Sequence, residues 1–213
     1  NLYKRASELV YILEAKDKQS GHDKQILSIM GREDLVEVLF EKACEPLQGF
    51  RDPLAEIEAR ARDTSIVILN EAHDESLHRD FSRIVIERLR PLGYDILALE
   101  DLDAEGFKDR PVPFRLRETD GYYLRESTFG KFVRAAKQEG YRLVAYEQRE
   151  EQRTYPPDAV DVIHEREEAQ ANNLMKQIFK ENPKAKVVLH VGHAHAVKHP
   201  FESPLHDGRT LRM

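Results

Sequence analysis

The sequence predicts an α/β fold: a mainly parallel sheet of at least four strands, flanked by helices and preceded by a helical N-terminal region. Three observations lead to this prediction. Four short apolar runs, rich in β-branched residues, are typical of strands covered on both faces. The segments between them carry the apolar stripes of amphipathic helices. Strands that alternate with helices in this way form parallel sheets with right-handed crossovers.

The N-terminal region, residues 1–62, is expected to be helical. One helix is indicated by apolar residues that recur every fourth position from Leu35 to Ala43. A second helix has Asp52 as its N-cap and Pro53 in its first turn, where both residue types favour a helix start.

The core, residues 63–199, contains the four apolar runs and the site motifs. Strands are expected near residues 65–70, 95–100, 142–147 and 186–191. Helical stripes lie over Phe81–Leu89 and Phe129–Ala136, and a charged helix covers residues 159–181. Residues 101–127 have no clear period and are expected to be irregular. Residues 200–213 form a tail, and the whole chain is expected to be a single domain.

The composition narrows the functional classes. The 213 residues carry a formal net charge of −6, which gives no general reason to bind nucleic acid. No apolar run is long enough for a membrane-spanning helix, so no transmembrane segment is expected. Cys44 is the only cysteine and cannot form an intrachain disulfide, which suits the cytosol and an exported protein equally. Because the first residue is not Met, removal of a leader stays open. The sequence does not indicate the oligomeric state.

Ionisable side chains follow all four predicted strands. The first strand leads to Glu71 and His73, the second to Glu100, the third to Glu147 and the fourth to His195. Ligands of open parallel sheets bind beyond the carboxyl ends of the strands, which is where these residues fall. Polar residues after one strand can simply mark its exit to solvent. Four such ends together favour a functional site.

Clustered carboxylates and imidazoles suit two kinds of chemistry. They can bind a divalent cation through nitrogen and oxygen ligands, or act as a general acid–base pair. Glu71 and His73 are two residues apart, so in an extended chain their side chains point the same way. His193 and His195 have the same spacing, whereas His190 could be a core histidine. No Gly-x-Ser-x-Gly elbow or glycine-rich phosphate loop is present, which argues against a serine hydrolase and a nucleotide site.

Four short segments also carry motifs of a known superfamily: Ile68–Asp74 with His78, Leu99–Glu100, Arg166–Glu167 with Ala171 and Asn173, and Val191–His195. They resemble, in that order, the Gly-Glu-x-His motif, the second acidic position, the Arg-Asp/Glu helix and the closing Gly-x-x-His segment of the erythromycin esterase/ChaN-like (TIKI-related) superfamily. The motif glycine is Asn70 here, a residue that tolerates left-handed backbone, and the helix Met is Gln170.

The resemblance implies a hydrolase that cleaves an ester or amide bond in a small-molecule or peptide substrate. His73 would be the general base or a metal ligand, and Glu71 would orient it or share the metal. Glu100 and His195 would complete the catalytic site, with Arg166 in a supporting role. The resemblance also favours an exported, periplasmic protein, with a cytoplasmic location kept open.

Participation of a metal stays open at this stage. Glu71, His73, Glu100 and His195 offer a mixed nitrogen and oxygen set suited to Mn, Co or Zn. A metal would lower the pKa of its bound water, whereas a metal-free site would activate water with His73 alone.

The ChaN branch of the superfamily implies a rival function, a haem- or iron-binding protein. His78 and His193 are the candidate cofactor-binding histidines, and Tyr122 or Tyr123 is a further candidate iron ligand. The irregular residues 101–127 would then shape the haem pocket.

Overall fold

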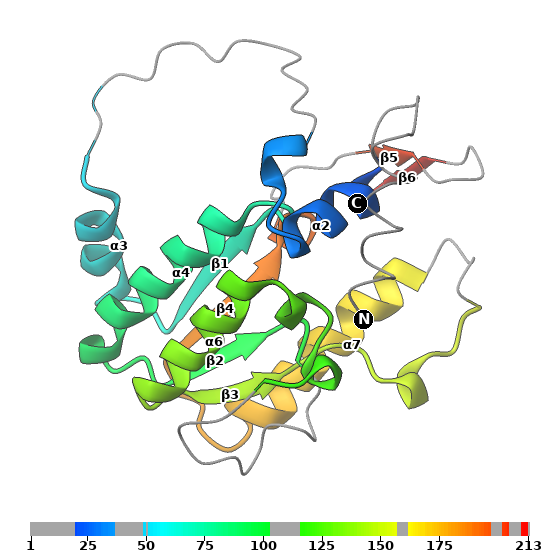
Figure 1. Ribbon diagram of the computed structural model, residues 1–213. Helices are drawn as coiled ribbons and strands as arrows, with labels where there is room; N and C mark the ends of the chain where they lie inside the picture. Colours follow the sequence, from blue (N-terminus) through cyan, green and yellow to red (C-terminus); the bar gives the residue numbers. More distant parts are fainter. Residues whose placement is uncertain are drawn as a thin grey trace.

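A four-stranded parallel sheet with helices on both faces forms the centre of the computed structural model (Figure 1). The structure describes residues 20–36, 49, 51–102, 116–156, 162–196, 202–204 and 210–212. The strands are β1 (Ile66–Glu71), β2 (Ile96–Leu99), β3 (Arg142–Ala145) and β4 (Val187–Gly192), in the spatial order β1-β4-β2-β3. The predicted fold class and all four predicted strands are confirmed.

The register of the sheet places several strand ends side by side. In β1, Glu71 is paired with Gly192 of β4. On the other side of β4, Leu99 of β2 is paired with His190. Residues that leave β1, β2 and β4 therefore emerge at one edge of the sheet.

Two apolar cores lie on the two faces of the sheet. The first face is covered by α3 (Pro53–Ala61), α4 (Ser76–Leu89) and α6 (Ser127–Gln138), and the other by α7 (Val162–Leu174). Successive β2 residues alternate between them, so Leu97 packs in the first core and Ala98 in the second. This double coverage explains why β2 is apolar at consecutive positions. The edge strand β1 was expected to be covered on both faces as well, but its Ile66 and Ile68 are 44% and 53% exposed.

The helix signals of the sequence are found at the positions expected. Asp52 caps α3, its Oδ1 accepting a hydrogen bond of 2.9 Å from the Leu54 N–H, and Pro53 occupies the first turn. Gly140 follows α6 with a φ of 80°, the left-handed conformation that a glycine adopts most easily.

The remaining elements are shorter. They are α2 (Gly21–Ile29), η1 (Glu33–Leu35), η2 (Arg90–Leu92), η3 (Glu118–Asp120), η4 (Tyr123–Arg125), η5 (Glu150–Gln152), η6 (Met175–Phe179), η7 (His193–Ala196), β5 (Glu202–Pro204) and β6 (Thr210–Arg212). Strands β5 and β6 form an antiparallel pair. Within the part of the chain that the structure describes, no helix is both long and apolar enough to span a bilayer.

Some predicted elements differ from the observed ones. At the start of the predicted Leu35–Ala43 helix the structure has only the 3₁₀ turn η1, and the rest of that helix, with Cys44, lies outside the described residues. The charged helix predicted over 159–181 is α7, continued by the π-helical η6. The segment predicted to be irregular contains two 3₁₀ turns in its described part, η3 and η4.

The start of α4 is held by the N-terminal region. Glu75 is its N-cap residue but makes no capping bond through its side chain. Instead, the Glu33 carboxylate accepts 2.9 Å hydrogen bonds from the N–H and the hydroxyl of Ser76. A distant carboxylate thus satisfies an N–H that the helix itself leaves unpaired.

Candidate active site

The carboxyl edge of the sheet gathers two clusters of ionisable side chains. The first, which we call the buried cluster, consists of Glu71 at the end of β1, His73 in the turn after it, and Arg79 of α4. The second, the pocket cluster, consists of Glu100, Glu147, Arg166 and His195, which come from the ends of β2 and β3, from α7 and from η7.

The buried cluster holds a carboxylate against an imidazole. His73 Nδ1 lies 2.9 Å from Glu71 Oε1. The Glu71 side chain is only 1% exposed, whereas that of His73 is 17% exposed. Because an ionised carboxylate can only accept, Nδ1 is the donor, and the neutral ring keeps its lone pair on Nε2.

Arg79 is the counterion of Glu71. Its Nε and Nη2 donate to the two carboxylate oxygens of Glu71 at 2.8 and 3.0 Å, which is a bidentate pair. His190 Nε2 adds an ion-pair contact of 3.3 Å to Oε2, without the geometry of a hydrogen bond. Burial opposes ionisation of Glu71, but contacts with His190, His73 and Arg79 outweigh it and hold the pKa of Glu71 well below its usual range.

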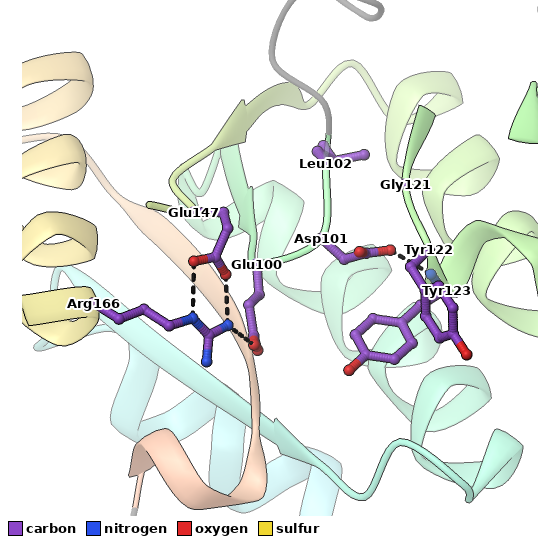
Figure 2. A pocket seen from close by; sticks show the side chains of 8 residues that line it. All are labelled: Glu100, Asp101, Leu102, Gly121, Tyr122, Tyr123, Glu147 and Arg166. Carbon is purple, nitrogen blue, oxygen red and sulfur yellow. Dashed lines mark hydrogen bonds and ion pairs between the residues drawn. The ribbon is translucent and has the colours of Figure 1, made fainter. Parts of the chain in front are cut away.

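The pocket cluster is built around Arg166 (Figure 2). Its Nη2 donates to Glu100 Oε1 at 2.7 Å and to Glu147 Oε2 at 2.6 Å, and its Nε donates to Glu147 Oε1 at 2.9 Å. About a third of the side chain is exposed for Arg166, at 35%, and for Glu147, at 32%. Solvent reaches this cluster through Arg166 and Glu147, since the side chains of Glu100 and His195 are only 9% and 12% exposed.

His195 lies between two carboxylates. Its Nδ1 contacts Glu167 Oε1, and its Nε2 lies 3.1 Å from both Glu100 Oε1 and Arg166 Nη1. A neutral ring would accept from Arg166, whereas a charged ring donates to Glu100. Hydrogen bonds to Glu100 and Glu167 raise the pKa of His195 to about 9, so the charged form is present at neutral pH. His195 and the Arg166 guanidinium, despite burial of Glu100, lower the pKa of that carboxyl to about 2.

Gly192 is the point at which the two clusters meet. Its N–H donates to Glu100 Oε2 at 2.9 Å. A Cβ atom on Gly192 would lie 2.4 Å from His73 Nε2 and 3.4 Å from Glu100 Oε2. The missing side chain therefore makes room for the His73 ring, and Nε2 faces the pocket cluster.

A pocket of about 370 Å³ opens beside the clusters, lined by Glu100, Asp101, Leu102, Gly121, Tyr122, Tyr123, Glu147 and Arg166 (Figure 2). One wall is attached to the buried cluster, because the Tyr123 ring stacks on His73 with centroids 4.2 Å apart and planes at 16°. The Tyr123 N–H donates to Asp101 Oδ2, which fixes this wall. Burial raises the pKa of Asp101 to about 6.

The structure brings together all five residues predicted to be catalytic, in two clusters and not in one. The two predicted cofactor-binding histidines lie elsewhere: His78 Nδ1 accepts a 3.0 Å hydrogen bond from the Ala72 N–H, and His193 is exposed on η7. Asn70, which replaces the motif glycine, is part of β1 and does not have a positive φ.

Two contact residues of the site, Arg79 and Glu126, were missing from the prediction. Tyr123 had been named only as a candidate iron ligand, and Glu167 only as a motif residue beside Arg166. Arg79 belongs to a helix rich in charged residues, where the sequence gives no sign that it faces inward. Glu147 was noticed as a strand-end carboxylate, and its bond to Arg166 places it in the pocket cluster.

The arrangement of the four predicted metal ligands does not fit a divalent cation. Glu71 is neutralised by Arg79 and Glu100 by Arg166, so guanidinium groups occupy the places where a cation would bind. Both ring nitrogens of His195 already contact carboxylates, Nδ1 that of Glu167 and Nε2 that of Glu100. Among the described residues, no group of three or more His, Cys, Asp and Glu side chains is placed to hold a metal ion.

No family model and no curated protein matches this sequence. Two solved structures are similar in part. One, titled "Bacterial protein toxins", has 15% identity and a TM-score of 0.45, and the match covers 71% of this chain and 36% of that one. The other is RRSP, a MARTX toxin effector domain from Vibrio vulnificus CMCP6, with 16% identity, a TM-score of 0.46, and coverage of 75% and 38%. The matches span less than two fifths of both solved chains, and the similarity is too distant to bear on activity.

Proposed function

We propose that this protein is a hydrolase of an ester or amide bond that uses His73 as its general base without a metal. The hydrogen bond from His73 Nδ1 to the buried carboxylate of Glu71, 2.9 Å long, carries this proposal. A carboxylate in this position fixes the tautomer of the ring and stabilises the imidazolium that forms during catalysis. The superfamily resemblance of the strand-end motifs implies the same reaction class and supports the proposal.

The first step is the attack of water on the substrate carbonyl. Nε2 of His73 takes one proton from the water while the water oxygen bonds to the carbonyl carbon. The carbon–oxygen double bond opens to a tetrahedral oxyanion. When this collapses, the bond to the leaving group breaks and the leaving group takes the proton from His73. The Nδ1 hydrogen bond to Glu71 is kept in both the neutral and the transiently protonated ring.

The proposed donors to the oxyanion are the Arg166 guanidinium and the His195 imidazolium of the pocket cluster, each of which is also paired with carboxylates. Arg166 and charged His195 lie beside Glu100, on the side of the site that His73 Nε2 faces. Fixed cations aimed at developing negative charge are among the strongest contributions to catalysis. Glu100 and Glu147 hold the Arg166 fork in place through three hydrogen bonds.

The adjoining pocket is the proposed binding site for the acyl or leaving group. Its volume of about 370 Å³ suits a small molecule or one peptide side chain. Its walls combine tyrosine rings with the carboxylates of Glu100, Asp101 and Glu147.

The test is a hydrolysis screen with chromogenic esters and fluorogenic peptides, run with and without a chelator. We expect turnover that survives chelation and falls by about 100- to 10,000-fold in His73→Ala. His164→Ala is the matched control, because His164 is an exposed histidine of α7 outside both clusters, and it should keep wild-type turnover. Turnover that disappears on chelation, or that persists in folded His73→Ala, would overturn the proposal.

A further inference from the structure

We infer that Arg79 is a positioning residue for the proposed base: it sets the place and the tautomer of His73 by holding both its carboxylate and its backbone. This inference deepens the proposed function and rests on it. Arg79 does not face the pocket, since its side chain is 1% exposed, so it acts through Glu71 and His73.

Four hydrogen bonds run from the Arg79 guanidinium to groups around the base. Two reach the oxygens of Glu71, as described above. Nη2 also donates to the carbonyl oxygen of His73 at 3.0 Å, and Nη1 donates to Glu126 Oε2 at 3.1 Å. The planar guanidinium therefore fixes two groups. One is the Glu71 carboxylate, which orients the imidazole, and the other is the peptide unit of His73 itself.

Glu126 anchors the far end of this network. Its carboxylate caps α6 by accepting hydrogen bonds of 2.6 Å from the N–H groups of Thr128 and Phe129. The guanidinium carbon of Arg79 lies 5.1 Å from the Phe129 ring centroid and 5.4 Å from that of Tyr123, the residue stacked on His73. Arg79 thus links β1, the turn after it, and the N-terminus of α6.

The chemistry of the network requires an arginine. A lysine ammonium presents three donors from a single point, whereas these acceptors lie around the edge of a planar fork. Without the fork, the Glu71 carboxylate keeps only imidazole contacts, at His73 Nδ1 and His190 Nε2, and is no longer held in one orientation. An acceptor that can turn away from Nδ1 no longer fixes the proton on that nitrogen, and both ring tautomers become accessible.

The experiment compares Arg79→Met and Arg79→Lys with Arg83→Met. Arg83 is the matched control because it lies one turn later on α4 and pairs with Asp80 and Glu87, away from the site. In each variant, ¹⁵N NMR of the imidazole rings reports the tautomer of His73, assigned by its loss in His73→Ala. This readout requires no substrate. Turnover is measured in parallel with the best substrate of the hydrolysis screen.

We expect the Nδ1–H tautomer of His73 in the wild type and Arg83→Met, and a mixture of tautomers in both Arg79 variants. Turnover should fall by about 100-fold, in kcat and not in KM, because the base is misplaced while the pocket is intact. If Arg79→Met does not fold, Glu126→Gln tests the same network, because it removes only the far anchor and should also shift the tautomer. An unchanged tautomer in a folded Arg79 variant overturns the inference. A wild type that shows the tautomer but hydrolyses nothing contradicts the proposed function alone.

Discussion

The buried cluster and the pocket cluster are made of the same three chemical groups, a carboxylate, a guanidinium and an imidazole, but they differ in exposure. In the buried cluster, Glu71 and Arg79 are each 1% exposed. In the pocket cluster, a third of Arg166 and of Glu147 is in contact with solvent. The difference in exposure matches the two roles that we propose: the first cluster holds the base, and the second contacts what enters the pocket. Ion pairs of these two kinds also differ in energy.

The largest expected effect is that of Glu71→Gln, which breaks the buried cluster. It leaves the buried Arg79 with a single carboxylate contact, to Glu126, and we expect this to cost about 3–5 kcal/mol of unfolding free energy. Turnover should fall by about 1,000-fold or more, because the tautomer of His73 is no longer fixed. Because Glu71 is buried although it ends a strand, we expect its replacement to lower stability as well as turnover.

Glu147→Gln is the matching change in the pocket cluster, and its loss of unfolding free energy is compared with that of Glu71→Gln. Since the Glu147–Arg166 pair is partly exposed and Glu100 still pairs with Arg166, we expect a loss of only about 1 kcal/mol. Denaturant unfolding of both variants gives the two values. Equal losses would mean that burial does not distinguish the clusters.

A smaller effect is expected from pH, and it sharpens the role of the pocket cluster. Because the pKa of His195 is raised from 6.5 to about 9, its charged form contributes stability that is fully present below pH 6.5 and is lost as the pH rises through 9. If the imidazolium stabilises the oxyanion, kcat/KM should fall in the same alkaline range.

Glu167→Gln removes one of the two carboxylates that raise this pKa. The alkaline limb of the pH–rate profile and the NMR titration of the His195 ring should both move toward neutral pH. The acid limb should not move, since Glu167 makes no contact with the buried cluster among the bonds of the described residues. If the alkaline limb of the pH–rate profile stays near pH 9 while the NMR titration of His195 moves, His195 does not take part in catalysis.

The smallest effect is expected from metals. Calorimetric titration with Mn, Co and Zn should give the same result for the wild type and for a His73→Ala, His195→Ala double variant, because neither cluster has a vacant carboxylate. Binding that the double variant abolishes would restore the metal-dependent mechanism suggested by the sequence. Any binding common to both proteins would point to other ligands, such as His199 and His206, which lie outside the described residues.

The sheet and half of the site could be predicted because their signals are local. Four apolar runs identify the strands, and the residues directly after them, such as Glu71 and Glu100, fall at one edge in any parallel sheet. Arg79 could not be found in this way. It lies eight residues beyond Glu71 on a charged helix, and only the packing of α4 against β1 and α6 turns it inward.

The division into two clusters was also beyond the sequence. Motif spacing gives four ligand-like residues, which is equally consistent with one shared metal. The two clusters are separate because Glu71 and Glu100 are paired with arginines from two different helices, Arg79 of α4 and Arg166 of α7. The Glu100–Arg166 pair joins residues 66 positions apart in the chain and leaves no periodic signal.

The close approach of Gly192 to His73 has a consequence for how this protein can change during evolution. A side chain at position 192 would overlap the ring at position 73, so the two positions cannot vary independently. Related chains with alanine or a larger residue at 192 should therefore have a smaller residue than histidine at 73, or a displaced turn after β1. Loss of the glycine would mark the lineages in which this active site has been abandoned.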